Sequence, residues 1–142
     1  MSKLEIYNVS GELLDTIDTR TLSDVKNNKK SEVNSYRDQI LNSGVTFNDT
    51  LFDSTQDSRQ NLAGYSAAIA SGVPLPDNFT WRDASNVNQS MTESDLLSFS
   101  STMITFVNNV YSSSWTHKNA IDALATIEEV DNYDYTGGWP SN

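Results

Sequence analysis

The feature that most constrains the fold is a run of apolar residues at helical spacing in the last third of the chain. These residues recur mainly every three or four positions: Leu96, Phe99, Met103, Phe106, Val107, Val110, Ile121, Leu124 and Ile127. The spacing predicts an amphipathic helix over residues 92–130. Thr92 and Asp95 stand three residues apart and resemble a capping box at its beginning. At 1.5 Å per residue, this helix would be roughly 55 Å long.

A helix of this length does not fit inside a compact domain of 142 residues, because such a domain has a radius of gyration of about 14 Å. Two interpretations remain open. Either the serines at 112–114 interrupt the helix, or the outer part of the helix packs on another chain. We favour the second interpretation, and the sequence therefore predicts a homo-oligomer or a component of a larger assembly.

The rest of the chain alternates shorter helices with turns. Together with the long helix, apolar spacing and capping residues predict helices at about 21–43, 55–71 and 92–130. Alternating apolar residues around turn residues predict short β-hairpins at about 3–18, 45–53 and 79–90. The expected fold class is α-dominant α+β, with the hairpins interspersed between the helices.

The chain is expected to divide into an N-terminal β-hairpin that would serve as a docking arm (1–20), a helical domain (21–132) and an aromatic C-terminal tail (133–142). The tail combines aromatic residues with two glycines and a proline, which is typical of a flexible segment with adhesive side chains. Tyrosine and tryptophan are frequent anchors of protein interfaces. The candidate partner-contact residues are Tyr111, Trp115, Tyr133, Tyr135 and Trp139.

The stretch TQDSRQNLAGYSAAIASG at residues 55–72 places polar and charged side chains next to one another, as a reactive site would. A helix entry explains them better, because Ser54 or Thr55 can accept hydrogen bonds from the first free backbone N–H groups. Arg59 is expected to pair with a nearby acid at the surface. Gly64, which costs about 1 kcal/mol relative to alanine in a helix, is expected to let another element approach closely. The residues expected to pack on the long helix are Leu62, Tyr65 and Ile69.

Charge and composition argue against several classes of partner. The net charge is −10 at pH 7, and the basic residues do not form the stripe that phosphate binding requires. Nucleic acid and an anionic membrane are therefore not expected as partners. The chain has no cysteine, which excludes disulfides and thiolate metal sites. Its first residues contain no apolar core of signal-peptide length, so synthesis in a cytoplasm is expected.

No group of residues matches a catalytic or metal-binding pattern. His117 is the only histidine, and its helical neighbours Ser113 and Asp122 would lie at the surface without an oxyanion hole. Acidic residues gather around 49–57 and 128–134 without the ligand spacing of a calcium loop. We therefore expect no catalytic residue, no metal site and no cofactor, and we do not expect an enzyme.

Three segments of the chain carry a family resemblance: SYRDQILNSGVTFNDTLFDSTQDSRQNLAGYSAAI, FTWRDASNVNQSMTESDLLSF and KNAIDALATIEEVDNYD. The matching features are Arg37-Asp38, Gly44-Val45, Phe47, Phe52, Asp57-Ser58-Arg59, Asn61-Leu62, Trp81-Arg82 and Thr92. Over roughly residues 30–135, the chain resembles a domain of unknown molecular function that recurs in tail-fibre, tail-tip and tail-fibre-assembly proteins of tailed bacteriophages. The segment 84–86 departs from that family's pattern, and the predicted hairpin at 3–18 lies outside the resemblance.

The resemblance implies a role in the tail of a phage and implies no catalytic residues. The expected function is that of a non-enzymatic structural component of the tail, a fibre- or baseplate-associated adaptor that acts through protein–protein contacts. Its partners would be phage tail or fibre proteins, and its location would be the virion tail after synthesis in the cytoplasm of the host bacterium. The alternative is a tail-fibre assembly chaperone that is absent from the mature particle.

Overall fold

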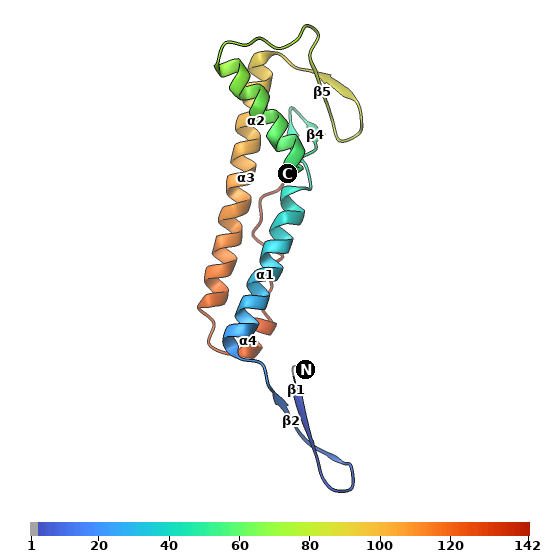
Figure 1. Cartoon of the computed structure of the whole chain (residues 1–142), viewed down its shortest axis with the longest axis vertical. Helices are drawn as coiled ribbons and strands as arrows, with labels where there is room; N and C mark the ends of the chain where they lie inside the picture. Colours follow the sequence, from blue (N-terminus) through green and yellow to red (C-terminus); the bar gives the residue numbers. More distant parts are fainter. Residues whose placement is uncertain (1–2) are drawn as a thin grey trace.

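The computed structural model describes residues 3–142, which form four helices and three two-stranded antiparallel hairpins (Figure 1). In chain order the elements are β1 (Lys3–Tyr7), β2 (Leu13–Asp18), α1 (Leu22–Leu41), β3 (Val45–Phe47), β4 (Thr50–Phe52), α2 (Gln56–Ala70), β5 (Thr80–Arg82), β6 (Asn88–Ser90), α3 (Glu93–Asp122) and α4 (Ile127–Asp131). Since 50% of the residues are helical and 16% lie in strands, the predicted helix-dominant α+β class is confirmed. A hairpin is present in each of the three predicted regions.

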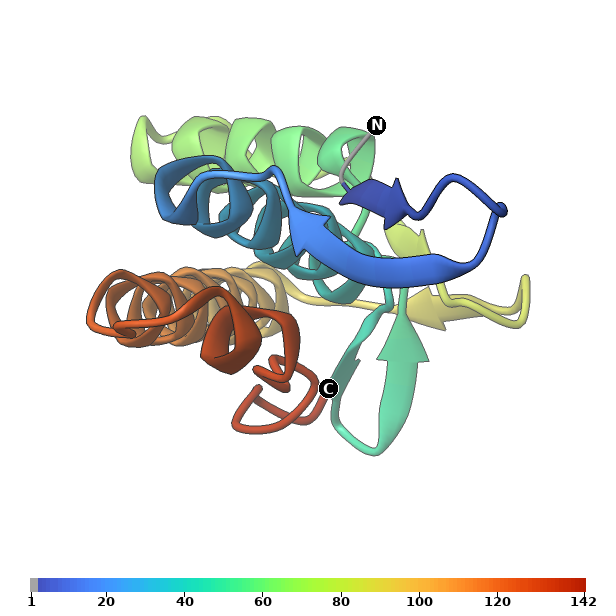
Figure 2. The ribbon, with the colours of Figure 1, turned by 90° about the horizontal axis from the view of Figure 1, so that it is seen from below.

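Helix α3 is the axis of an elongated body (Figure 1). Helix α2 lies beside the first half of α3, and helix α1 lies beside its second half. The view along the long axis places the C-terminal segment on the opposite side of the α1–α3 pair from α2 (Figure 2). The β1–β2 hairpin extends beyond the end of the body at which α1 begins (Figure 1).

Helix α3 begins as predicted and ends earlier than predicted. The Asp95 N–H donates to Thr92 Oγ1, and the Thr92 N–H donates to Asp95 Oδ2, both at 3.0 Å, which makes the expected capping box. The helix ends at Asp122, so it is about 45 Å long. A second cap explains the difference, because Thr126 Oγ1 accepts a hydrogen bond from the Glu129 N–H at 3.2 Å and begins α4.

The structure contradicts both interpretations of the long helix. Residues 112–114 remain helical, and the outer half of α3 packs within its own chain. Val25 and Val33 of α1 bury against Ile121 of α3 and Val130 of α4, and each of the four is at most 4% exposed. The body is elongated and not compact, because α1 and α2 together cover the length of α3. The length of α3 therefore gives no argument for a second chain.

The hairpins between the helices bring aromatic side chains to the first half of α3. Phe99 is fully buried, and its ring centroid lies 5.2 Å from Phe47, 4.8 Å from Phe52 and 5.8 Å from Trp81. Phe47 and Phe52 come from β3 and β4, and Trp81 comes from β5. Aromatic pairs at these separations add to the free energy of burial. The core beside α2 therefore includes side chains of the hairpins as well as of the helices.

Ser54 and Thr55 both act at the start of α2, in different ways. Thr55 is the N-cap, since its Oγ1 accepts a hydrogen bond from the Ser58 N–H at 3.3 Å. Ser54 is fully buried, and its hydroxyl donates to Leu41 O at 2.6 Å and accepts from the Gly44 N–H at 2.8 Å. Ser54 therefore ties the end of α1 to the start of α2. The polar stretch that follows is a helix entry, as predicted.

Two of the expected contacts of α2 are present, and two other expectations for this helix are wrong. Leu62 is 1% exposed in the core it shares with α3, and Ile69 packs on the same core, as predicted. Tyr65 is 39% exposed and instead packs on the β5–β6 hairpin, with its ring centroid 6.0 Å from that of Trp81. Gly64 lies on an exposed face, and a Cβ placed on it would meet nothing within 4 Å. No close approach of another element accounts for this glycine.

Candidate protein-binding surfaces

The β1–β2 hairpin exposes apolar side chains on one of its faces. Residues directly opposite each other in an antiparallel pair share a face, and here Leu4 pairs with Ile17 while Ile6 pairs with Asp15. That face therefore carries three aliphatic side chains and one carboxylate. Leu4, Ile6 and Ile17 are 52%, 38% and 44% exposed. We call Leu4, Ile6, Asp15 and Ile17 the hairpin face.

Further apolar side chains are exposed near the hairpin turn. They are Tyr7, Val9, Leu13 and Leu14. A two-stranded hairpin on its own is at best marginally stable in water, and a group of exposed apolar side chains marks an interaction site. The hairpin therefore has the composition of a docking element.

Arg20 anchors this hairpin to the helical body. Its Nη2 lies 2.6 Å from Asp18 Oδ2 and 2.8 Å from Asp131 Oδ2, so one guanidinium joins the end of β2 to the end of α4. Hydrogen bonds from Arg20 favour the charged carboxylates. They lower the pKa of Asp18 to about 2 and also lower the pKa of Asp131. We call Arg20, Asp18 and Asp131 the arginine clamp.

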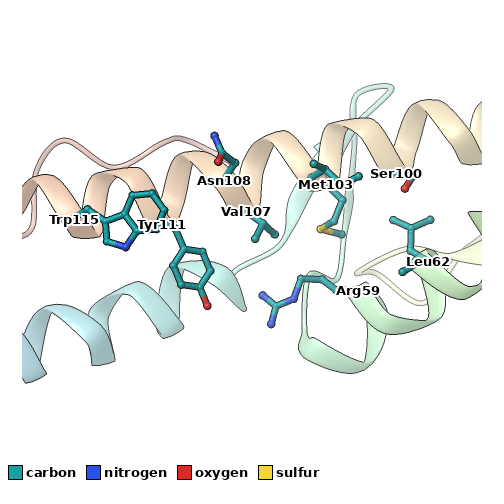
Figure 3. A pocket seen from close by; sticks show the side chains of 10 residues that line it. Arg59, Leu62, Ser100, Met103, Val107, Asn108, Tyr111 and Trp115 are labelled. Atoms are coloured by element: carbon teal, nitrogen blue, oxygen red, sulfur yellow. The ribbon is translucent and has the colours of Figure 1, made fainter.

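A second exposed apolar surface is a groove between α2 and α3, with a volume of about 580 Å³ (Figure 3). Its lining includes Leu62 of α2 and Ile104, Val107, Tyr111 and Trp115 of α3. These α3 residues follow one another at three- and four-residue spacing, so they form a stripe along the helix. Ile104 and Trp115 are 66% and 53% exposed. Grooves of this composition are typical of sites that bind a segment of another protein.

Arg59 is the one charged side chain that lines this groove among residues 3–142. Its Nη1 atom is covered by protein and has no hydrogen-bond partner. No acid of the described chain lies within 4.0 Å of it, so the expected surface ion pair is absent. A covered donor without a partner is unfavourable. A carboxylate that entered the groove would supply charge-assisted hydrogen bonds to the guanidinium.

The five predicted contact residues divide between two places. Tyr111 and Trp115 line the groove, with ring centroids 6.2 Å apart. Tyr133, Tyr135 and Trp139 are half-buried and pack on the cluster between α1, α3 and α4. The structure therefore brings Tyr111 and Trp115 together at one surface, whereas the other three pack against helices of their own chain. A role in contacts with a partner stays a prediction for all five.

His117 holds the C-terminal segment against α3. Its Nε2 lies 2.7 Å from Gly137 O and its Nδ1 lies 2.7 Å from Tyr133 Oη. Because a carbonyl accepts, Nε2 carries the proton, and in the neutral imidazole Nδ1 then accepts from the tyrosine hydroxyl. The imidazole also stacks on Trp139 at 5.3 Å between centroids. The segment 133–142 was expected to be flexible and is instead fixed along the helices.

The described residues offer no arrangement typical of metal chemistry or of a membrane span. Within residues 3–142, no three His, Asp or Glu side chains lie close enough together to hold a metal ion. Over the same range, each helix is too short or too polar to cross a lipid bilayer.

The profile of one protein family matches most of the chain. Residues 24–137 match the family described as "Domain of unknown function (DUF4376)". No curated protein and no solved structure matches the chain. The matched range includes the groove, the aromatic core and the hydrogen bonds of His117, and it leaves the β1–β2 hairpin outside. Because the match extends over well more than half of the chain, the protein belongs to the DUF4376 family.

Proposed function

We propose that this protein is a non-enzymatic structural component of a bacteriophage tail, an adaptor associated with the fibre or the baseplate. It acts through protein–protein contacts. The observation that carries this proposal is the β1–β2 hairpin, which is set outside the family domain and exposes an apolar face. Its partner is a neighbouring subunit of the tail, either another protein or another copy of this chain, which covers that face.

Physical arguments support an adaptor over an independent enzyme. The body is elongated, and the hairpin projects from one end of it (Figure 1). The arginine clamp sets the direction in which the hairpin leaves the body, because one guanidinium binds Asp18 and Asp131 together. A rigid body with an oriented apolar arm positions one protein relative to another. An active site would require perturbed titratable groups converging in a cleft, whereas the α2–α3 groove is lined mainly by apolar side chains.

The phage assignment is supported by the sequence resemblance over residues 30–135. Under this proposal, the chain is made in the cytoplasm of the host bacterium and resides in the virion tail. The net charge of −10 disfavours nucleic acid and anionic lipid as partners, and leaves tail or fibre proteins, including further copies of this chain, as the expected partners.

Mass spectrometry of purified phage particles tests the proposal. The chain should be present in intact particles, in a constant ratio to the tail proteins, and should remain after washing at high salt because apolar contacts are not screened. Its absence from mature particles would refute a structural role. If, in addition, co-expression raised the yield of soluble fibre, the chain would be a tail-fibre assembly chaperone instead.

A further inference from the structure

We propose that the hairpin face of one molecule docks in the α2–α3 groove of a second copy, so that the chains associate head to tail. This inference rests on the proposed function in one respect, namely that the hairpin is a docking arm. It goes further by identifying the partner as a second copy of this chain and by naming the surface that receives the arm.

The two surfaces match in chemistry. The hairpin face presents Leu4, Ile6 and Ile17 with one carboxylate, that of Asp15. The groove is lined mainly by apolar side chains with one guanidinium, that of Arg59. Within residues 3–142, neither Asp15 nor Arg59 takes part in an ion pair. Docking would bury the aliphatic side chains and pair the two free charges in one step.

The two surfaces also match in size. Each strand of the hairpin has five or six residues, which corresponds to about 17–20 Å. The groove follows α3 from Ser100 to Trp115, which corresponds to about 22 Å at the rise of an α-helix. The hairpin therefore covers most of the length of the groove when the two lie side by side.

The groove of the same molecule is not available to the hairpin. The hairpin leaves the end of the body at which α1 begins, and it points away from the body (Figure 1). Three residues, 19–21, separate β2 from α1, and within them Arg20 is held by Asp18 and Asp131 together. A second molecule must therefore supply the groove. Because two different surfaces meet, the contact is heterologous and continues into a ring or an open chain of molecules.

Charge reversal on each side tests the contact. The variants are Asp15→Lys on the hairpin face and Arg59→Glu in the groove. Matched controls are Thr16→Lys, on the other face of the same strand, and Gln60→Glu, which is exposed and does not line the groove. Sedimentation velocity of full-length protein, from micromolar to millimolar concentration, gives the average mass. Circular dichroism and thermal melting verify that each variant folds.

The wild type should have an average mass above that of one chain, which rises with concentration. Each charge reversal should weaken self-association by about 30-fold or more, and the two controls should behave as the wild type. An equimolar mixture of Asp15→Lys and Arg59→Glu should associate again with the two variants alternating, because each hairpin meets a groove of opposite charge on the other variant. The double variant, with both charges reversed, should associate again.

A wild type that stays monomeric at every concentration would overturn this inference. So would self-association that is indifferent to both charge reversals, as expected for a symmetric contact between two grooves. Neither result bears on whether the chain is found in phage particles, so the proposed function can survive the failure of this inference. Conversely, a chain absent from particles can still self-associate as described.

Discussion

Replacing Ser54 by alanine removes a hydroxyl that joins the end of α1 to the start of α2. The hydroxyl of Ser54 donates to Leu41 O at 2.6 Å and accepts from the Gly44 N–H at 2.8 Å. Ser54 is fully buried, and Leu41 and Gly44 are buried too. Water therefore cannot easily replace the lost oxygen, and Ser54→Ala leaves one carbonyl and one N–H without partners.

The size of the effect follows from these two groups. A buried polar group left unsatisfied costs about 1–3 kcal/mol, so the free energy of unfolding should fall by about 3 kcal/mol in total. That is a large fraction of the roughly 5–15 kcal/mol of a typical domain. The corresponding fall in Tm is roughly 10 °C. The matched control is Thr55→Ala, which removes an exposed N-cap hydroxyl worth about 1 kcal/mol.

Urea unfolding of both variants measures these differences, and amide hydrogen exchange locates them. The Gly44 N–H should be protected in the wild type and should exchange faster in Ser54→Ala than in Thr55→Ala. The reasoning would be refuted if Ser54→Ala cost no more than Thr55→Ala, or if the protection of Gly44 were unchanged.

Three further predictions concern the aromatic core, the C-terminal segment and the arginine clamp. Phe99→Ala should lower the free energy of unfolding by about 3–5 kcal/mol, whereas Ile104→Ala on the exposed groove should change it by less than about 1 kcal/mol; equal losses in urea unfolding would contradict the assignment of the core. Trp139→Ala removes rings stacked on the helices and should cost about 1–3 kcal/mol; an unchanged Tm would mean that the segment is not held. Because Arg20 lowers the pKa of Asp18 to about 2, the clamp's contribution is fully present above the unfolded-state pKa of about 3.9 and is lost as pH falls through about 2. NMR signals that link the hairpin to the body should therefore change over this range, and a clamp unaffected by acid would contradict the pairing.

Sequence patterns predicted the local elements of the fold but not the contacts between segments that are distant in the chain. Apolar spacing located the helices, and Thr92 with Asp95 marked the start of α3 correctly. The predicted end of α3 was too late because Ile121, Leu124 and Ile127 keep a helical spacing across a break in the helix. They keep this spacing because α3, α4 and the loop between them bury against the same cluster. A second cap at Thr126 was the signal that could have located the break.

The candidate surfaces were predicted only in part, because some of their contacts join residues that are distant in the sequence. The hairpin at 3–18 was expected from local alternation and turn residues, which act between neighbours in the chain. The pairing of Trp139 with His117 joins two distant segments, and an aromatic, glycine-containing tail is compatible with either a free or a packed segment. Arg59 in the groove lacked any sequence signal, because whether an arginine finds an acid depends on packing across the fold.

The most direct test of the account is the amount of this chain in purified particles assembled with altered hairpins. Particles would be produced with wild-type protein, with the hairpin face made polar (Leu4→Ser, Ile6→Ser and Ile17→Ser together), or with the control Thr16→Ser on the other face. Quantitative mass spectrometry should find the wild type and the control at equal levels and the polar variant strongly depleted, although its helical body still folds. Equal incorporation of the polar variant would contradict the hairpin as the docking arm, and absence of all three proteins would contradict the structural role itself.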